Sequence, residues 1–152
     1  MISFFAGSAI AVYLFAFGYQ VSQLRKHPKA PTAVFQFAAA LSIVLHGAAI
    51  YGLLFSKAGL DLSLLKICAL ISLVINVMLF FSGLKKPIHS LFLFLFPISA
   101  LSLFAATTTP STKAAVVIPP TIEAHVLISI LAYSTLAIAA LQALLIGYQN
   151  WQ

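Results

Sequence analysis

The chain has 152 residues, of which 62% are hydrophobic and only 7% are charged, and its mean hydropathy is +1.11. Soluble domains carry roughly a quarter of charged residues, so this composition excludes a soluble globular protein as well as a disordered one. The formal net charge of +6 arises from basic residues scattered between apolar runs, a pattern typical of membrane topology rather than of nucleic-acid binding. The sequence therefore predicts a polytopic membrane protein that contacts lipid and not nucleic acid.

The lengths of the apolar runs predict an all-α helix bundle that forms a single transmembrane domain over residues 1–152. Spans of about 20 apolar residues cross a bilayer, and Pro, Gly and charged residues mark their ends. Five spans are expected, at residues 3–21, 33–55, 64–83, 89–106 and 122–148. The loops on one side contain Arg25, Lys26, Lys29, Lys85 and Lys86, and those on the other contain Lys57, Lys66 and Lys113. The excess on the first side predicts that the N-terminus is outside and the C-terminus cytoplasmic.

The first two spans differ in their polar content. The first has no ionisable group in its core, and we interpret it as a packing helix. The second contains His46 within the apolar sequence SIVLHGAAIYG, with Ser42 four residues before it on the same face. Two interpretations of His46 stay open on equal terms: a structural histidine that hydrogen-bonds a neighbouring helix, or a ligand for a cofactor.

A polar stripe follows in the third span, where Cys68, Ser72 and Asn76 are spaced at i, i+4 and i+8. Such stripes usually hydrogen-bond adjacent helices, which is the favoured interpretation. The alternative is the lining of a ligand cavity or a small transport module. The absence of a carboxylate within the spans argues against a proton-coupled or cation-coupled carrier.

The fifth span carries His125 just inside its first turn, after Thr121, which is expected to cap the helix. Ser129, Ala132 and Tyr133 follow at i+4, i+7 and i+8, so one face of this helix is small and a neighbouring helix can approach it closely. An ionisable residue at the edge of a membrane helix is costly without a partner. His125 is therefore the main candidate for a functional site.

Several classes of chemistry are absent from the sequence. It has no glycine-rich phosphate loop, no nucleophile elbow and no H-E-x-x-H motif. Its two acidic residues, Asp61 and Glu123, cannot form a paired-carboxylate site within the membrane, and the single cysteine excludes a C-x-x-C-H haem-attachment motif. No catalytic residue is assigned, and an enzyme is the less expected class. What remains is histidine within membrane helices. A neutral imidazole can ligate haem iron in a hydrophobic cleft between helices, here the second, third and fifth, and spacing alone does not select this role over a purely structural one.

The segment from His125 to Leu141, HVLISILAYSTLAIAAL, resembles the cytochrome c assembly protein family, the CcsA-like and HemX-like haem handlers, and most of all their YpjD-type inner-membrane branch. His125, Ala132 and Tyr133 match the family pattern, and LSIVLHG and LDLSLL are shorter supporting matches. The resemblance implies a multi-pass protein of the bacterial inner (plasma) membrane that holds haem noncovalently near the outer face. His125 would be the axial ligand of the haem iron, with His46 and Tyr133 as further haem-binding residues.

The chain also departs from this family. It ends at Gln152, where the family continues through about three more helices, and it has neither the tryptophan-rich loop nor a second external histidine. The resemblance therefore implies that further cytochrome c assembly subunits, or a second copy of the chain, complete the site. The alternative function is a non-catalytic membrane scaffold or regulator of tetrapyrrole metabolism of the HemX-like kind.

Overall fold

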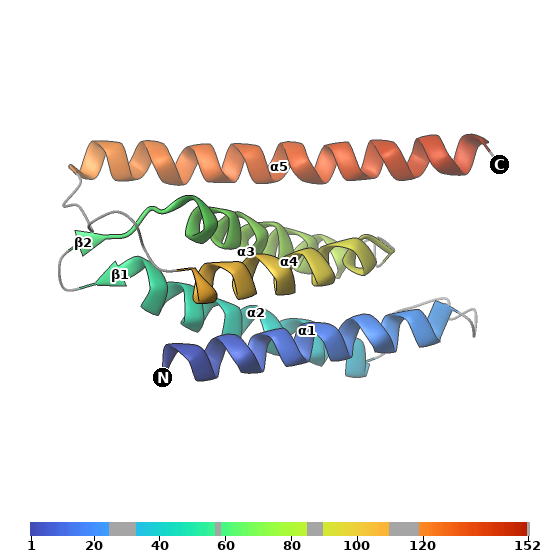
Figure 1. Ribbon diagram of the computed structural model, residues 1–152. Helices are drawn as coiled ribbons and strands as arrows, with labels where there is room; N and C mark the ends of the chain where they lie inside the picture. Colours follow the sequence, from blue (N-terminus) through green and yellow to red (C-terminus); the bar gives the residue numbers. More distant parts are fainter. Residues whose placement is uncertain (25–32, 57–58, 85–89, 110–118, 152) are drawn as a thin grey trace.

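The computed structural model describes residues 1–24, 33–56, 59–84, 90–109 and 119–151. Five helices make up nearly all of these residues, each long and apolar enough to cross a membrane (Figure 1). They are α1 (Ile2–Leu24), α2 (Ala33–Leu54), α3 (Leu64–Gly83), α4 (Ser90–Thr108) and α5 (Pro120–Trp151). The predicted all-α, five-span architecture is confirmed, and the chain is a multi-pass membrane protein.

The helix bounds lie within three residues of the predicted spans. The structure differs from the prediction mainly in the connection after α2 and at the start of α5. After α2, the strands β1 (Phe55–Ser56) and β2 (Gly59–Leu60) pair antiparallel as a short hairpin where a plain loop was expected. The prediction that Thr121 caps the fifth helix is wrong, because α5 begins one residue earlier. The carbonyl of Pro119 accepts hydrogen bonds from the backbone N–H groups of Ile122 and Glu123 at 2.9 and 3.1 Å. Pro120 suits the first helical position because it has no N–H to satisfy.

The helices pack in a layered arrangement. α1 packs against α2 and α4, α3 packs against α4 and α2, and α5 packs mainly against α3. In Figure 1, α3 and α4 accordingly lie between α5 and the α1–α2 pair. The N-terminus, the β1–β2 hairpin and the start of α5 are all at one end of the bundle, which we call the hairpin end (Figure 1).

Two buried clusters form the core of the described part of the chain, and they differ in the size of their side chains. Near the hairpin end the helices meet largely through small residues, which allow close backbone approach. These are Ala6, Ala9, Ala49, Ala69 and Ala106. The second cluster is built around aromatic rings, Tyr13, Phe35, Phe92 and Phe96.

α5 is the least embedded helix. Only 11% of the residues in its most apolar stretch are buried in the bundle, against 44% of those in α4. Ile130 and Ser134 are buried, and Ala137, Ile138 and Leu141 pack partly against the aromatic cluster. These residues recur at helical spacing, so one face of α5 contacts the bundle and the opposite face is open.

Candidate functional site

A buried pair of polar rings joins the first two helices. Tyr13 on α1 and His46 on α2 are both fully buried, and the hydroxyl oxygen of Tyr13 is 3.0 Å from Nδ1 of His46. The two rings meet edge to face with centroids 5.7 Å apart, and the ring of Phe96 on α4 also packs against Tyr13, with centroids 5.4 Å apart. Tyr13 was not among the residues predicted from the sequence. The available signal was that a buried tyrosine in an apolar span needs a partner for its hydroxyl.

The surroundings of His46 favour its structural interpretation. Nε2 makes no hydrogen bond of normal geometry with the described residues, although the backbone of Ala69 on α3 interacts with the imidazole. The ring has no exposed surface, so a porphyrin cannot reach it without repacking of α1, α2 and α3. We therefore interpret His46 as an interhelical hydrogen-bonding residue.

The polar stripe of the third span links α3 to α4. The amide nitrogen Nδ2 of Asn76 donates to the hydroxyl of Ser99 at 2.6 Å and to the carbonyl of Ser72 at 2.7 Å. The hydroxyls of Ser72 and Ser102 are 2.9 Å apart. This arrangement agrees with the favoured, interhelical interpretation of the stripe. Cys68 does not belong to this network, because its side chain is exposed.

Ser99→Ala tests this network. The substitution removes the acceptor of the Asn76 amide on α4 while leaving its bond within α3, so we expect the free energy of unfolding to fall by about 1 kcal/mol. Unfolding by sodium dodecyl sulfate, followed by circular dichroism, measures this difference. Ser90→Ala, at an exposed position of the same helix, is the matched control and should leave the midpoint unchanged. Equal midpoints for Ser99→Ala and the control would contradict a stabilising role for the network.

The two predicted haem-binding residues on α5 lie on its open side. His125 is exposed, and Tyr133 has 65% of its surface exposed. At about 100° per residue, His125 lies about 200° around the axis from Glu123, which faces the bundle. Ser129 is half-buried and Ala132 is exposed. The small face expected to receive a neighbouring helix is thus not covered by the described part of this chain.

A groove exists between the helices expected to form the haem cleft, but His125 is not in it. We call it the hairpin groove; it has a volume of about 270 Å³ and opens between the end of α2, the hairpin, the start of α3 and the start of α5. Its lining residues are Leu54, Phe55, Leu60, Leu62, Leu70, Glu123, Val126, Leu127 and Ile130. Neither His46 nor Tyr133 lines it, so the structure does not bring the three predicted residues together.

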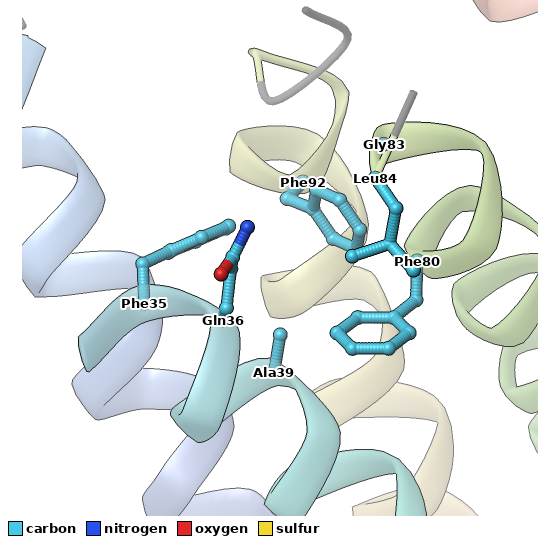
Figure 2. Close-up of a pocket in the computed structure, with 7 residues that line it drawn as sticks. All are labelled: Phe35, Gln36, Ala39, Phe80, Gly83, Leu84 and Phe92. Atoms are coloured by element: carbon cyan, nitrogen blue, oxygen red, sulfur yellow. The ribbon is translucent and has the colours of Figure 1, made fainter. Parts of the chain in front are cut away.

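A second cavity, between α2, α3 and α4, is too small for a cofactor. Figure 2 shows its lining, in which the aromatic rings of Phe35, Phe80 and Phe92 surround the space and, among the described lining residues, Gln36 alone supplies side-chain polar atoms. Its volume of about 10 Å³ holds roughly one water molecule at most. This cavity therefore has no capacity for a tetrapyrrole.

An ion pair also lies at the hairpin end, at the start of α3. Nζ of Lys66 donates to Oδ2 of Asp61 at 2.5 Å, and both residues have only 7% of their surface exposed. Oδ1 of Asp61 accepts a hydrogen bond from the backbone N–H of Ser63. The backbone N–H of Asp61 donates to the carbonyl of Leu54. This pair was not predicted from the sequence, because residues five apart do not share a helix face and Asp61 precedes α3.

Beyond these features, the described residues contain no group of three or more His, Cys, Asp or Glu side chains that could hold a metal ion. Comparison with known proteins adds no further constraint: no family model matches the chain, and no curated protein or solved structure matches it either.

Proposed function

We propose that the chain is a membrane component of haem handling in cytochrome c biogenesis, located in the bacterial inner membrane, with His125 as an axial ligand of haem iron. The observation that carries this proposal is the open imidazole at the start of α5. His125 is exposed, and no hydrogen bond joins its side chain to the described residues. The resemblance of the segment from His125 to Leu141 supports the same residue. The predicted topology puts this end of α5 at the outer face.

The residues that follow His125 fit a flat ligand. Ser129 and Ala132 lie one and two turns further along the same face, and their short side chains leave room beside the imidazole. Tyr133 is next to them and can present its ring to the ligand edge. Haem supplies an iron centre for axial ligation by imidazole. The residues of this chain would bind and orient it, and none of them is assigned a catalytic step.

A second surface is needed to enclose such a ligand, because the open face of α5 supplies only one wall. The same face continues through Leu136, Ala139, Ala140 and Ala143, of which Leu136 has 64% of its surface exposed and the alanines are also exposed. Small residues favour close helix contact in membranes. A further cytochrome c assembly subunit or a second copy of the chain would therefore cover the ligand and supply the other axial position.

The visible absorption spectrum of the detergent-purified chain, oxidised and reduced, tests this proposal. We expect a Soret band that His125→Ala lowers at least tenfold, because the substitution removes the proposed iron ligand. His27→Ala is the matched control, since the sequence places His27 in a basic loop on the opposite side of the membrane; its band should equal that of the unmodified chain. Absence of a band from the unmodified chain, or an equal band in His125→Ala, would contradict the assignment.

A second candidate, a non-catalytic scaffold or regulator of tetrapyrrole metabolism, is favoured by the same uncovered face of α5. It requires contact with a partner but no haem. Ala140→Trp would place a large ring on this face without disturbing the side packed on α3. A stable partner that copurifies with the haem-free chain and is lost in Ala140→Trp would support the scaffold. A chain that purifies alone and loaded with haem would contradict it.

A further inference from the structure

Among the described residues, the hairpin groove combines an apolar lining with one charged group. Eight of the nine described lining residues are Leu, Ile, Val or Phe, and the ninth is Glu123 in the first turn of α5. Leu54 and Ile130 are buried at 4% and 5% exposure, whereas Phe55 and Leu127 are more than half exposed. The groove therefore has a closed apolar floor and an apolar rim that is accessible from outside the bundle.

The position of Glu123 gives the groove a negative charge. The chain has only two acidic residues, and the other, Asp61, is held by Lys66. Glu123 is partly buried, and no ion pair joins it to any described residue. A cationic group on a ligand is thus attracted to this end of the groove and an anionic group is repelled.

The size and the charge of the groove both argue against haem there. A volume of about 270 Å³ is just below the roughly 300–1,000 Å³ of typical small-molecule pockets, so it suits one alkyl chain better than a flat tetrapyrrole. Haem propionates would also be repelled by Glu123. The groove therefore calls for a different ligand from the one proposed at His125, and this inference does not depend on that proposal.

The exposed rim indicates where the ligand comes from. Phe55 directly follows α2, and Leu127 lies in the first part of α5. Both helices are of membrane length, so we expect the rim near the level where acyl chains meet head groups. A lipid of the bilayer can insert one chain sideways past these residues, keep its other chain in the membrane and bring its head group to Glu123. A lipid that reached the groove through water would first have to leave the bilayer, which costs about 0.8 kcal/mol for each CH₂ group exposed to water.

We propose that the hairpin groove binds a membrane lipid whose head group ends in an ammonium, such as phosphatidylethanolamine, with one acyl chain along Leu54, Leu70 and Ile130. The ammonium pairs with the carboxylate of Glu123 and donates hydrogen bonds to it. A primary ammonium is a stronger partner than a quaternary one because it retains N–H donors. An anionic phosphatidylglycerol is the least favoured of the three head groups.

Native mass spectrometry of the full chain, released from detergent with equal amounts of dioleoyl phosphatidylethanolamine, phosphatidylcholine and phosphatidylglycerol, tests the head-group preference. We expect the ethanolamine lipid to be retained about fivefold more than the glycerol lipid, as for one partly shielded ion pair, with the choline lipid between them. Glu123→Gln keeps the shape of the side chain but removes its charge, so this variant should retain the ethanolamine and glycerol lipids about equally. Equal retention by the unmodified chain, or an unchanged preference in Glu123→Gln, would overturn the proposal.

A pair of tryptophan substitutions tests the location of the site. Leu127→Trp enlarges a rim residue of the groove, and we expect it to lower retention of all three lipids at least threefold. Leu131→Trp, at an exposed position of α5 outside the groove, is the matched control and should retain them as the unmodified chain does. Equal retention by the two variants would place the lipid elsewhere. Because neither experiment measures haem, their failure is distinguishable from failure of the proposed function.

Discussion

Lys66→Met is expected to lower the free energy of unfolding by about 3 kcal/mol, because it takes the ammonium away from a carboxylate that stays buried. The Asp61 side chain has little access to water and lies 2.5 Å from Nζ of Lys66, so salt screens this pair weakly. Asp61 would keep the hydrogen bond from the Ser63 N–H, which places the loss at the lower end of the range for broken buried pairs. Unfolding by sodium dodecyl sulfate, followed by circular dichroism, measures the difference.

A substitution of the other member of the pair, Asp61, separates the effect of the charge from that of lost packing. Asp61→Asn leaves Lys66 without its carboxylate, but a lysine near the end of a membrane helix can extend its ammonium toward the head groups. We therefore expect a smaller loss, about 1 kcal/mol. The double variant Asp61→Asn/Lys66→Met should recover part of the loss seen for Lys66→Met. A double variant less stable than Lys66→Met would show that the pair contributes through packing rather than through charge.

The membrane spans were predictable because the bilayer constrains them so strongly. Backbone groups inside hydrocarbon must be satisfied within each segment, so apolar runs of sufficient length become helices. The third span was predicted with the same bounds as α3, residues 64–83. The hairpin at Phe55–Leu60 was not foreseen, because two-residue strands leave almost no pattern in the sequence. The first residue of α5 was also not predicted, because the apolar composition does not distinguish a helix that begins at Pro120 from one that Thr121 caps.

The helix faces were much harder to predict than the helices. α5 is apolar almost all round, so periodicity does not distinguish a face packed on protein from one that meets lipid. The small face containing Ala132 was expected to pack, yet the structure packs the side with Ile130 and Ser134 and leaves Ala132 exposed. For the same reason the sequence suggested a cleft containing His125, whereas Glu123 is the residue that faces the groove.

The sequence also did not show which buried side chains hydrogen-bond to one another across helices. His46 was recognised as an intramembrane polar residue, but nothing in its own span indicates that Tyr13, 33 residues earlier, supplies the hydrogen bond. That pairing follows from the packing of α1 against α2, which is set by the whole bundle. By contrast, Ser72 and Asn76 share one helix face, so their common role in contact with a neighbouring helix was predictable from spacing, although the structure alone identifies that helix as α4.

His46→Ala is expected to lower the free energy of unfolding by about 3 kcal/mol. The substitution leaves a cavity where α1 and α2 meet, and it leaves the buried hydroxyl of Tyr13 without its imidazole partner. Tyr13→Phe removes only the hydroxyl and should cost about 1 kcal/mol. The matched control is Tyr133→Phe, the same change at a tyrosine that is 65% exposed, which should leave stability unchanged. Unfolding by sodium dodecyl sulfate measures all three.

The double variant Tyr13→Phe/His46→Leu distinguishes a structural His46 from a haem ligand. Replacing both polar partners by apolar groups of similar size leaves neither side of this pair with an unsatisfied polar atom, so this variant should be more stable than His46→Ala by about 2 kcal/mol. If His46 acts only through Tyr13, any Soret band of the unmodified chain should persist in the double variant and still disappear in His125→Ala. Loss of the band from a stable double variant would instead make His46 an iron ligand. The closed packing of α1, α2 and α3 around its ring would then have to open for haem to enter, because the imidazole has no exposed surface.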